Sequence, residues 1–172
     1  SITKAVDKGT ITAGIIYDSN EPDITICHLD DDENFINSKQ IVMEGWQFAT
    51  NIITIESEGY IIAGYCNDTS GSFDAFLIKT DSLLHIEWIK NYGGESFDVI
   101  MDIHQTSDGN VAFAGYSESD AIGQDDIWVG LTDIDGNLLW EKKIGTVNSE
   151  MAFSIQQTSD ENLIIAGNRG SF

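Results

Sequence analysis

Proline, cysteine and positive charge are all scarce in this chain of 172 residues. There is one proline, Pro22, which we place in a loop, and eight lysine and arginine residues stand against 29 acidic ones, a formal net charge of −21. So acidic a surface repels nucleic acid and anionic lipid, and we expect neither as a partner. No run of ~18 apolar residues is present, so we predict no insertion into a membrane. The charge suits an extracellular or cell-surface setting.

The usual catalytic and cofactor-binding signatures are also absent from the sequence. There is no GxSxG, P-loop or GxGxxG motif and no CxxC pair. His28, His85 and His104 stand at unrelated positions without HxxxH spacing, which favours structural roles for all three. Cys27 and Cys66 fall in different repeats, and we interpret them as buried free thiols rather than a disulfide. We name no catalytic residue, and the pattern leans away from an enzyme.

What the chain does have is an internal repeat. An Ala-Gly pair closes a short apolar run four times, with the glycines 50, 51 and 52 residues apart: Ala13-Gly14, Ala63-Gly64, Ala114-Gly115 and Ala166-Gly167. A period of that size indicates one supersecondary unit copied in series. Turn residues precede each pair, and aspartates seven residues apart bracket the next apolar run in three copies. The bracketing pairs are Asp23 and Asp30, Asp74 and Asp81, and Asp126 and Asp133.

Each complete copy holds four runs rich in β-branched and aromatic residues, separated by Gly, Asp, Asn and Ser. In the third copy these runs cover roughly residues 99–105, 110–117, 126–132 and 137–144, and they read as strands joined by tight turns. The sequence thus predicts an all-β fold of four-stranded antiparallel blades in a β-propeller. The repeats span about 1–47, 48–96, 97–147 and 148–172 of one segment, the last incomplete.

About 3.4 blades do not close a ring, because propellers use ~4–8. We therefore expect either a piece of a longer protein or one part of an assembly that completes the ring by self-association.

Several motifs resemble those of a repeat family found in predicted secreted or surface proteins of bacteria and archaea. The segments that carry the resemblance are Gln105-Thr106-Ser107-Asp108-Gly109, Asp126-Ile127-Trp128, Asp74 to Asp81, and Tyr92-Gly93-Gly94. The similarity runs along the whole chain and is weakest in residues 1–47. It implies a propeller with an adhesive or scaffolding role and no assigned activity. The run from Asp133 through Gly136 to Trp140 is also similar to the tryptophan-docking motif of quinoprotein dehydrogenase propellers.

Carboxylates are the one class of chemically active side chain that the sequence holds in excess. Asp133, Asp135 and Asn137 place oxygen ligands at alternate positions around a turn, which is how Ca²⁺ is gathered. The competing interpretation is a hairpin turn in which the first aspartate caps backbone N–H groups. The repeat-opening Asp23, Asp74 and Asp126 suit such structural bonding to a neighbouring turn.

The loops between second and third strands, and those between repeats, are expected on one face. The first set is 18–22, 67–73 and 117–125, and the second is 44–48, 93–97 and 145–150. Aromatic and amide side chains there suit a glycan or a protein loop, although Phe48 and Phe97 read equally well as core residues. We select Trp46, Phe73, Asp120 and Gln124 as ligand-face residues.

The sequence therefore predicts a non-enzymatic extracellular or cell-surface propeller module for adhesion, scaffolding, or protein or glycan binding. One alternative is part of a glycan-cleaving or quinone-dependent propeller enzyme whose catalytic residues lie in other blades. A second alternative is a structural propeller stabilised by Ca²⁺.

Overall fold

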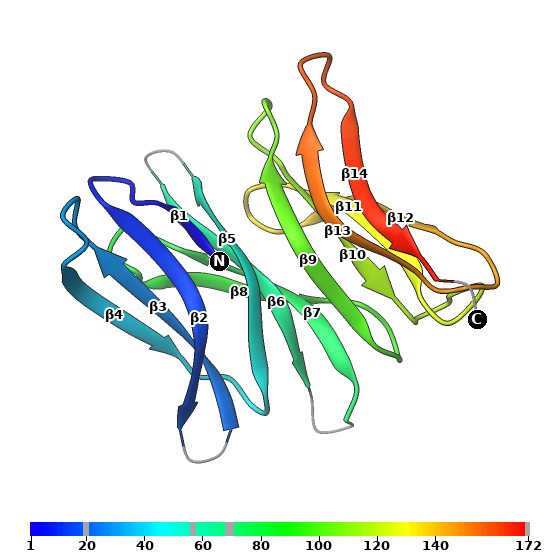
Figure 1. Cartoon of the computed structure of the whole chain (residues 1–172), viewed down its shortest axis with the longest axis horizontal. Helices are drawn as coiled ribbons and strands as arrows, with labels where there is room; N and C mark the ends of the chain where they lie inside the picture. The colour runs from blue at the N-terminus through cyan, green and yellow to red at the C-terminus, as the bar shows by residue number, and fades with distance from the viewer. Residues whose placement is uncertain (19–20, 56–57, 68–70, 171–172) are drawn as a thin grey trace.

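The structure of the protein is a computed structural model that describes residues 1–18, 21–55, 58–67 and 71–170. All of its regular elements are β-strands, and they form four separate antiparallel sheets (Figure 1). The first sheet comprises β1 (Ile2–Lys4), β2 (Thr10–Asp18), β3 (Glu21–Leu29) and β4 (Phe35–Ile41). The second comprises β5 (Gln47–Ile55), β6 (Gly59–Asn67), β7 (Phe73–Thr80) and β8 (Ile86–Tyr92).

The third sheet comprises β9 (Asp98–Gln105), β10 (Val111–Ser117), β11 (Asp126–Thr132) and β12 (Leu138–Ile144). The fourth is β13 (Glu150–Gln157) paired with β14 (Leu163–Arg169). In every sheet the strands lie in chain order, so each unit is a simple meander. The predicted all-β class and the repeated unit are confirmed, and the four strands expected in the third copy lie within two residues of their predicted bounds.

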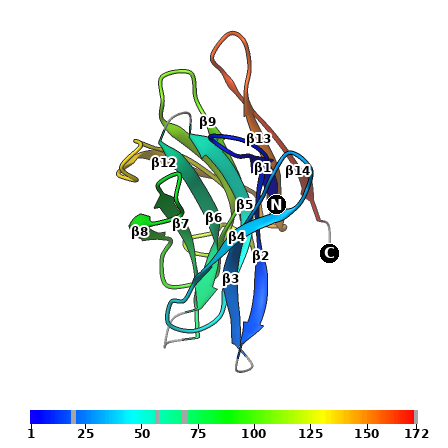
Figure 2. The same cartoon turned by 90° about the vertical axis from the view of Figure 1, so that its left-hand side faces the viewer.

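The four sheets follow one another along the long axis of the molecule and pack face to face (Figures 1 and 2). Alternate apolar side chains on each strand supply both faces, because successive side chains point to opposite sides of a sheet. Ile26 and Ile62 meet between the first two sheets, Leu77 and Phe113 between the next two, and Val129 and Ile155 between the last two. The stack thus has three apolar cores in series.

The first strands of consecutive sheets also lie next to one another. The Thr50 hydroxyl of β5 donates to the Ile100 carbonyl of β9 at 2.6 Å. Asp102 of β9 joins three units, because its carboxylate accepts from the Asn51 side chain on one side and from the Ile155 amide, at 2.8 Å, on the other. Polar contacts between neighbouring first strands therefore fix how each unit sits on the last.

The Ala-Gly pair has a local cause. β5, β9 and β13 each carry a bulge opposite it, where the pairing register shifts by one residue. The bulge brings a carbonyl oxygen over the glycine, so a Cβ on Gly64 would lie 2.1 Å from the Phe48 oxygen and one on Gly115 would lie 1.8 Å from the Val99 oxygen. The close contact at the last three glycines thus comes from a bulge within the sheet, whereas a Cβ on Gly14 of the first sheet would meet nothing within 4 Å.

Two smaller expectations meet different outcomes. Pro22 is not in a loop, because it is the second residue of β3 and pairs with Tyr17. Proline is tolerated there since the start of a strand need not donate every ladder hydrogen bond. Cys27 and Cys66 are not joined in a disulfide, in line with the prediction; Cys66 is buried as expected, whereas Cys27 is only half-buried.

The predicted ring is not seen in the described residues. Each sheet is open, and the first and fourth sheets lie at opposite ends of the molecule (Figure 1). A closed propeller therefore stays a prediction. Within the described ranges there is no helix whose length and hydropathy would let it cross a membrane.

Candidate binding edge

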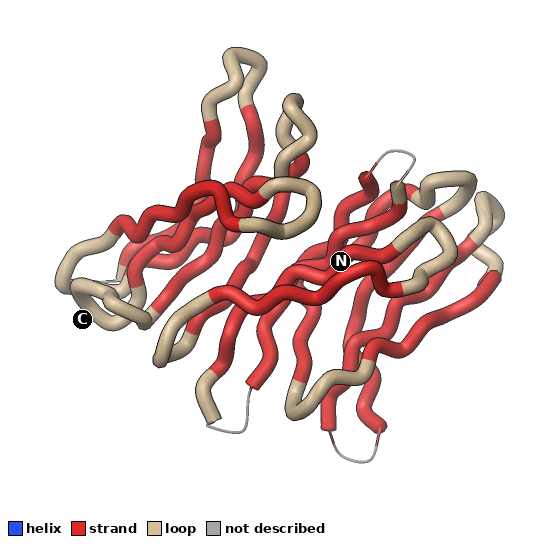
Figure 3. The backbone as a smooth tube through the Cα atoms, turned by 180° about the vertical axis from the view of Figure 1, so that it is seen from behind, coloured by secondary structure: helices blue, strands red, loops and turns tan. Residues whose placement is uncertain are grey.

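Loops from every unit meet along one edge of the stack, which we call the loop edge (Figures 1 and 3). The hairpin loops between second and third strands lie beside the loops that join one unit to the next. Backbone hydrogen bonds hold the two sets together: the amides of Asn67, Glu118 and Glu150 donate to the carbonyls of Trp46, Phe97 and Asp125 at 3.1, 2.8 and 2.8 Å. The expectation that both loop sets share one side is confirmed where the loops are described, while residues 19–20 and 68–70 of the predicted loops lie outside the described residues.

A buried polar side chain opens the first strand of each of the last three units and fixes the loop before it. The residues are Gln47, Asp98 and Glu150, at equivalent positions. Each accepts a hydrogen bond from the backbone amide four residues earlier, on Met43 at 3.2 Å, Gly94 at 2.7 Å and Thr146 at 2.8 Å. A buried acceptor without such a donor would be costly, so the pairing ties loop shape to folding.

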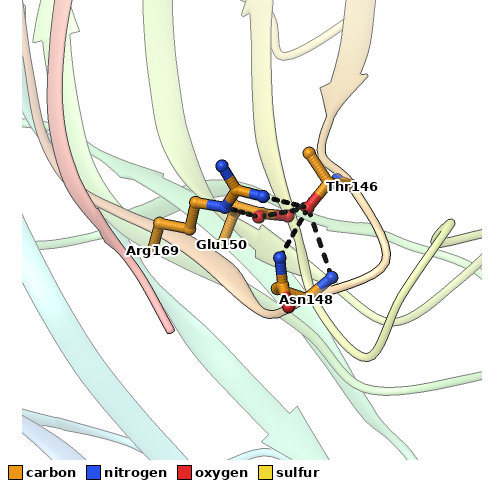
Figure 4. Close-up of polar contacts among 4 residues, drawn as sticks. All are labelled: Thr146, Asn148, Glu150 and Arg169. Atoms are coloured by element: carbon orange, nitrogen blue, oxygen red, sulfur yellow. Dashed lines mark hydrogen bonds and ion pairs between the residues drawn. The ribbon is translucent and has the colours of Figure 1, made fainter. Parts of the chain in front are cut away.

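Glu150, which opens the first strand of the fourth unit, also binds Arg169, the one arginine in the chain (Figure 4). Arg169 Nε lies 3.1 Å from Glu150 Oε1, and the Thr146 hydroxyl donates to the same oxygen at 2.6 Å. Thr146 Oγ1 in turn accepts from the backbone and side-chain nitrogens of Asn148. The Thr146 hydroxyl and amide, with Arg169 beside them, lower the pKa of Glu150 below its ordinary value.

Asp98, which opens the first strand of the third unit, is fully buried and accepts hydrogen bonds from more hydroxyl groups than Glu150 does. Its carboxylate accepts from the hydroxyls of Ser117 and Ser119, the latter at 2.7 Å, besides the Gly94 amide. Ser119 Oγ also accepts from the Ser96 amide at 3.1 Å. This serine-carboxylate cluster shapes the loop edge where the second and third units meet.

A row of five aromatic rings runs along the same edge: Phe48, Tyr65, Phe73, Phe97 and Tyr116. Consecutive ring centroids are 5.0 to 6.1 Å apart, and every ring is partly exposed. Burial raises the pKa of both tyrosines above the ordinary value. Phe48 and Phe97 are thus neither core residues nor isolated rim residues, because they belong to one continuous apolar strip that water still reaches.

Two open hollows of about 530 and 580 Å³ flank this strip and share Ser96 and Glu118. Gln124 and Asp125 line one of them, and Phe97 lines the other. Partial burial, with the charges of Asp125 and Asp98 nearby, raises the pKa of Glu118 above its ordinary value. The hollows therefore combine hydroxyl, amide and carboxylate groups with an aromatic wall.

Of the four residues selected for the ligand face, two lie at the aromatic row or a hollow and two lie elsewhere. Phe73 belongs to the aromatic row and Gln124 lines a hollow. Trp46 is 47% exposed at the far end of the edge, where its amide donates to the Asn67 side chain. Asp120 is exposed in a turn with a positive φ of 56°. The fold does not gather the four at one point, and Ser96, Asp98 and Glu118 were missed.

A larger hollow of about 640 Å³ lies between the first strands of three units, lined by Lys4, Thr54 and His104 among others. No ring of the aromatic row lines this hollow. The loop edge is therefore the stronger candidate for recognition.

The proposed calcium ligands lie at the opposite edge, in the turn between β11 and β12. Asp133 Oδ1 accepts from the amides of Asp135 and Asn137 at 3.1 and 2.7 Å, and Oδ2 accepts from the Asn137 side chain at 2.8 Å. Asp30 and Asp81 cap equivalent turns in the same way. Both carboxylate oxygens thus serve the hairpin, and the described residues contain no group of three or more His, Cys, Asp or Glu suited to a metal ion.

Two of the repeat-opening aspartates make structural hydrogen bonds. Asp126 accepts from the Ile122 amide of the preceding loop at 3.1 Å, as expected, whereas Asp23 accepts from the side chain of Gln40 in strand β4 at 2.8 Å and not from a turn. The missed Asp98 had a weak signal in the sequence, since polar residues recur 17 residues before the Ala-Gly glycine, as Gln47 and Asp98 do.

No protein-family model matches the chain, and no curated protein is similar enough to count as a relative.

Proposed function

We propose that the protein is a non-enzymatic, extracellular or cell-surface module that binds a glycan along the loop edge. The aromatic row beside the two hollows is the observation that carries this proposal. Sugar rings present C–H faces that stack on aromatic side chains, and hydroxyls that bond to amides and carboxylates. Phe73, Phe97 and Tyr116 offer the first surface, while Ser96, Glu118 and Gln124 offer the second.

The shape of the edge favours a chain-like ligand over a small molecule. Both hollows are open and shallow, and the row of rings continues across the second and third units. A small substrate would need a deeper enclosure to bury most of its surface. An extended oligosaccharide can instead gain contacts from several units at once.

A propeller is the proposed architecture for the complete assembly. Three features support it: one four-stranded antiparallel meander in about 50 residues, face-to-face packing, and first strands that lie side by side. The proposed acidic surface module would also stay soluble outside the cell, as its net charge of −21 favours.

A glycan array followed by calorimetry tests the proposal. The array would be probed with the wild-type chain and with Phe97→Ala, which removes the ring that joins Phe73 to Tyr116 in the row. We expect Phe97→Ala to weaken binding at least about tenfold, because buried aromatic anchors dominate such contacts. Phe35→Ala is the matched control, since Phe35 is 63% exposed on β4, away from the row.

Glu118→Gln separates recognition from folding, because Glu118 is exposed and its replacement leaves the strands intact. We expect weaker binding at an unchanged melting temperature. Absence of any glycan ligand would contradict the proposal. Release of a cleaved product from a bound glycan would instead favour the glycan-cleaving alternative, in which the catalytic residues lie in other blades.

A further inference from the structure

The two hollows of the loop edge are lined by carboxylates and by no cationic side chain. Glu118 borders both hollows, Asp125 lines the one of about 530 Å³, and Glu95 lines the one of about 580 Å³. None of the described residues that line either hollow is a lysine, an arginine or a histidine. A ligand that enters either hollow therefore meets negative charge.

These carboxylates receive few hydrogen bonds from the protein. Glu95 and Glu118 are exposed, and no side-chain hydrogen bond or ion pair joins either of them to another described residue. Asp125 is 8% exposed, and its Oδ2 accepts from the Ser149 hydroxyl at 2.5 Å. Its other oxygen, Oδ1, accepts no hydrogen bond within the described part of the chain. A nearly buried carboxylate oxygen without a donor is costly, so the hollow suits a ligand that supplies N–H or O–H groups.

Two cationic side chains on neighbouring strands are bound by other groups. Lys143 of β12 donates to the Ser119 carbonyl, and Arg169 Nε of β14 lies 3.1 Å from Glu150 Oε1. Neither forms an ion pair with a carboxylate that lines the hollows. The hollows thus keep their negative charge in the folded protein.

Repulsion among the carboxylates favours the same kind of ligand. Partial burial, together with the charges of Asp125 and Asp98, raises the pKa of Glu118 above its ordinary value. A positive charge in the hollow would stabilise the ionised form, because a nearby opposite charge favours ionisation. The carboxylates therefore favour a ligand that carries a cation.

We propose that the loop edge selects glycans with free amino groups, such as oligomers of 2-amino-2-deoxy sugars, over neutral, N-acetylated and acidic glycans. The ammonium group of the sugar donates to Glu118 or to Oδ1 of Asp125, and a C–H face of the sugar ring stacks on Phe97. The inference rests on the proposed function, since it names the class of glycan that the same edge would bind.

An ammonium group suits this site better than a hydroxyl or an N-acetyl group. It brings several N–H donors and a full charge, and its hydrogen bonds to carboxylates are roughly twice as strong as neutral ones. Aromatic faces such as those of Phe97 and Tyr116 also attract cations, whereas the carboxylates would repel a uronic acid. The net charge of −21 adds long-range attraction for a polycationic chain.

A lysine-rich peptide carries the same charge but fits the aromatic row less well. Its ammonium groups lie at the ends of flexible side chains, whereas sugar rings present rigid C–H faces. Such faces can stack along the row, whose consecutive ring centroids are 5.0 to 6.1 Å apart. The row therefore favours the sugar.

Calorimetry of the intact chain with matched oligosaccharides tests the proposal. Equal-length oligomers of glucosamine, N-acetylglucosamine, glucose and galacturonic acid are titrated separately. We expect the glucosamine oligomer to bind at least about tenfold more tightly than the N-acetylated one, and the galacturonic acid oligomer to bind most weakly. Raising the salt concentration from about 0.05 M to about 0.5 M should reduce the preference, because salt screens the attraction between charges.

Two glutamate variants locate the source of the preference. Glu118→Gln keeps the size of the side chain and removes its charge, so the preference for glucosamine over N-acetylglucosamine should fall at least about fivefold. Glu161→Gln removes the same charge from an exposed glutamate in the turn between β13 and β14, at the opposite edge (Figure 1), and should leave the preference within about twofold. Phe97→Ala should weaken the binding of both oligomers by a similar factor, since both sugars stack on that ring. Because both glutamates are exposed, melting curves of their variants should match wild type.

The outcomes separate amino-sugar selection from glycan binding itself. If the N-acetylated or the glucose oligomer bound as tightly as the glucosamine oligomer, and Phe97→Ala weakened that binding, glycan recognition at the loop edge would stand and the preference would be wrong. If none of the four oligomers bound, the inference would be overturned, and the glycan array would then decide the proposed function by itself. If a lysine oligopeptide of the same charge bound as tightly as the glucosamine oligomer, and lost as much affinity in Glu118→Gln, the choice of a glycan would be overturned.

Discussion

The two ends of the stack differ in the chemistry of their outward faces. On the first sheet, the outward positions hold Thr10, Thr12 and Thr25, all only partly buried. The register places these residues where the second sheet has Tyr60, Ile62 and Phe76, which are fully buried against the first sheet. The first sheet thus presents short hydroxyl side chains where an internal sheet presents large apolar ones.

The fourth sheet shows the opposite pattern. Its outward positions on β14 include Ile164, which is 60% exposed, and Ala166, which is exposed. The equivalent residues of the second sheet, Ile61 and Ala63, are buried in the core between the second and third sheets. The outward face of the first sheet consists of polar side chains suited to contact with water, whereas that of the fourth sheet has the composition of an internal face. The β14 end therefore exposes residue types that a neighbouring sheet covers inside the stack.

Exchanging residues between an internal face and the first face gives the largest expected effect. Phe76→Thr gives the second sheet the residue found at the equivalent position, Thr25, and leaves a cavity between the first two sheets. We expect a loss of about 3–5 kcal/mol in the free energy of unfolding, measured by denaturant titration.

The reciprocal change is the control. Thr25→Phe adds an apolar ring to an outward face, so the free energy of unfolding should change by less than about 0.5 kcal/mol while self-association increases. If Thr25→Phe destabilised the chain as much as Phe76→Thr, the two faces would not differ as described.

A second comparison contrasts Asp98, a buried loop anchor inside the stack, with Arg169, the exposed partner of the anchor Glu150 at the end of the stack. Asp98→Ala leaves the Gly94 amide and the Ser117 and Ser119 hydroxyls without their acceptor, and should cost about 2–3 kcal/mol in thermal or chemical unfolding. Arg169→Gln removes an ion pair whose arginine is 62% exposed and an exposed hydrogen bond to Thr146, and should cost less than about 1 kcal/mol. Equal losses of stability in the two variants would contradict the expectation that the buried anchor contributes more.

The smallest effect concerns the turns at the edge opposite the loop edge. Hydrogen bonds from Asn137 and Asp135 hold the pKa of Asp133 below its ordinary value. A lowered pKa means that the ionised carboxyl stabilises the folded state above its unfolded pKa, and that this stabilisation is lost as the pH falls through the folded value. Asp133→Asn should therefore lower the melting temperature at neutral pH, and the difference from wild type should shrink as the pH drops below about 4.

A chelator distinguishes this capping role from a calcium site in the same turn. Because both oxygens of Asp133 already accept hydrogen bonds, we expect the melting temperature to be the same in EGTA and in millimolar CaCl₂. A rise with calcium that Asp133→Asn abolishes would instead establish the calcium-stabilised alternative.

Local signals allowed the strands and turns to be predicted with close bounds. Alternating β-branched residues and the Asp-Gly-Asn turns act over a few residues, so their effect can be read without knowing the fold. The shared edge of the two loop sets followed from strand order alone. The bulge behind Gly64 and Gly115 did not, since it depends on the register between paired strands.

The loop edge was only partly predictable for a related reason. Phe73 and Phe97 were visible as aromatic loop residues, but their joining into one row with Tyr65 and Tyr116 depends on how neighbouring sheets pack. The recurrence of a polar residue before each Ala-Gly pair was only a weak signal for Asp98, because the serines that bury its carboxylate follow 19 and 21 residues later. Trp46 and Asp120 were selected by type, and the fold leaves them apart from the hollows.

The amino-acid sequence by itself determined the unit: a four-stranded meander whose period and turns are set by interactions between residues close in the chain. Only the tertiary structure decided which faces are covered. Whether Trp88 or Trp140 meets a turn, and whether Ile61 or Ile164 meets a core, depends on the neighbouring sheet, since burial is a property of the partner as much as of the residue.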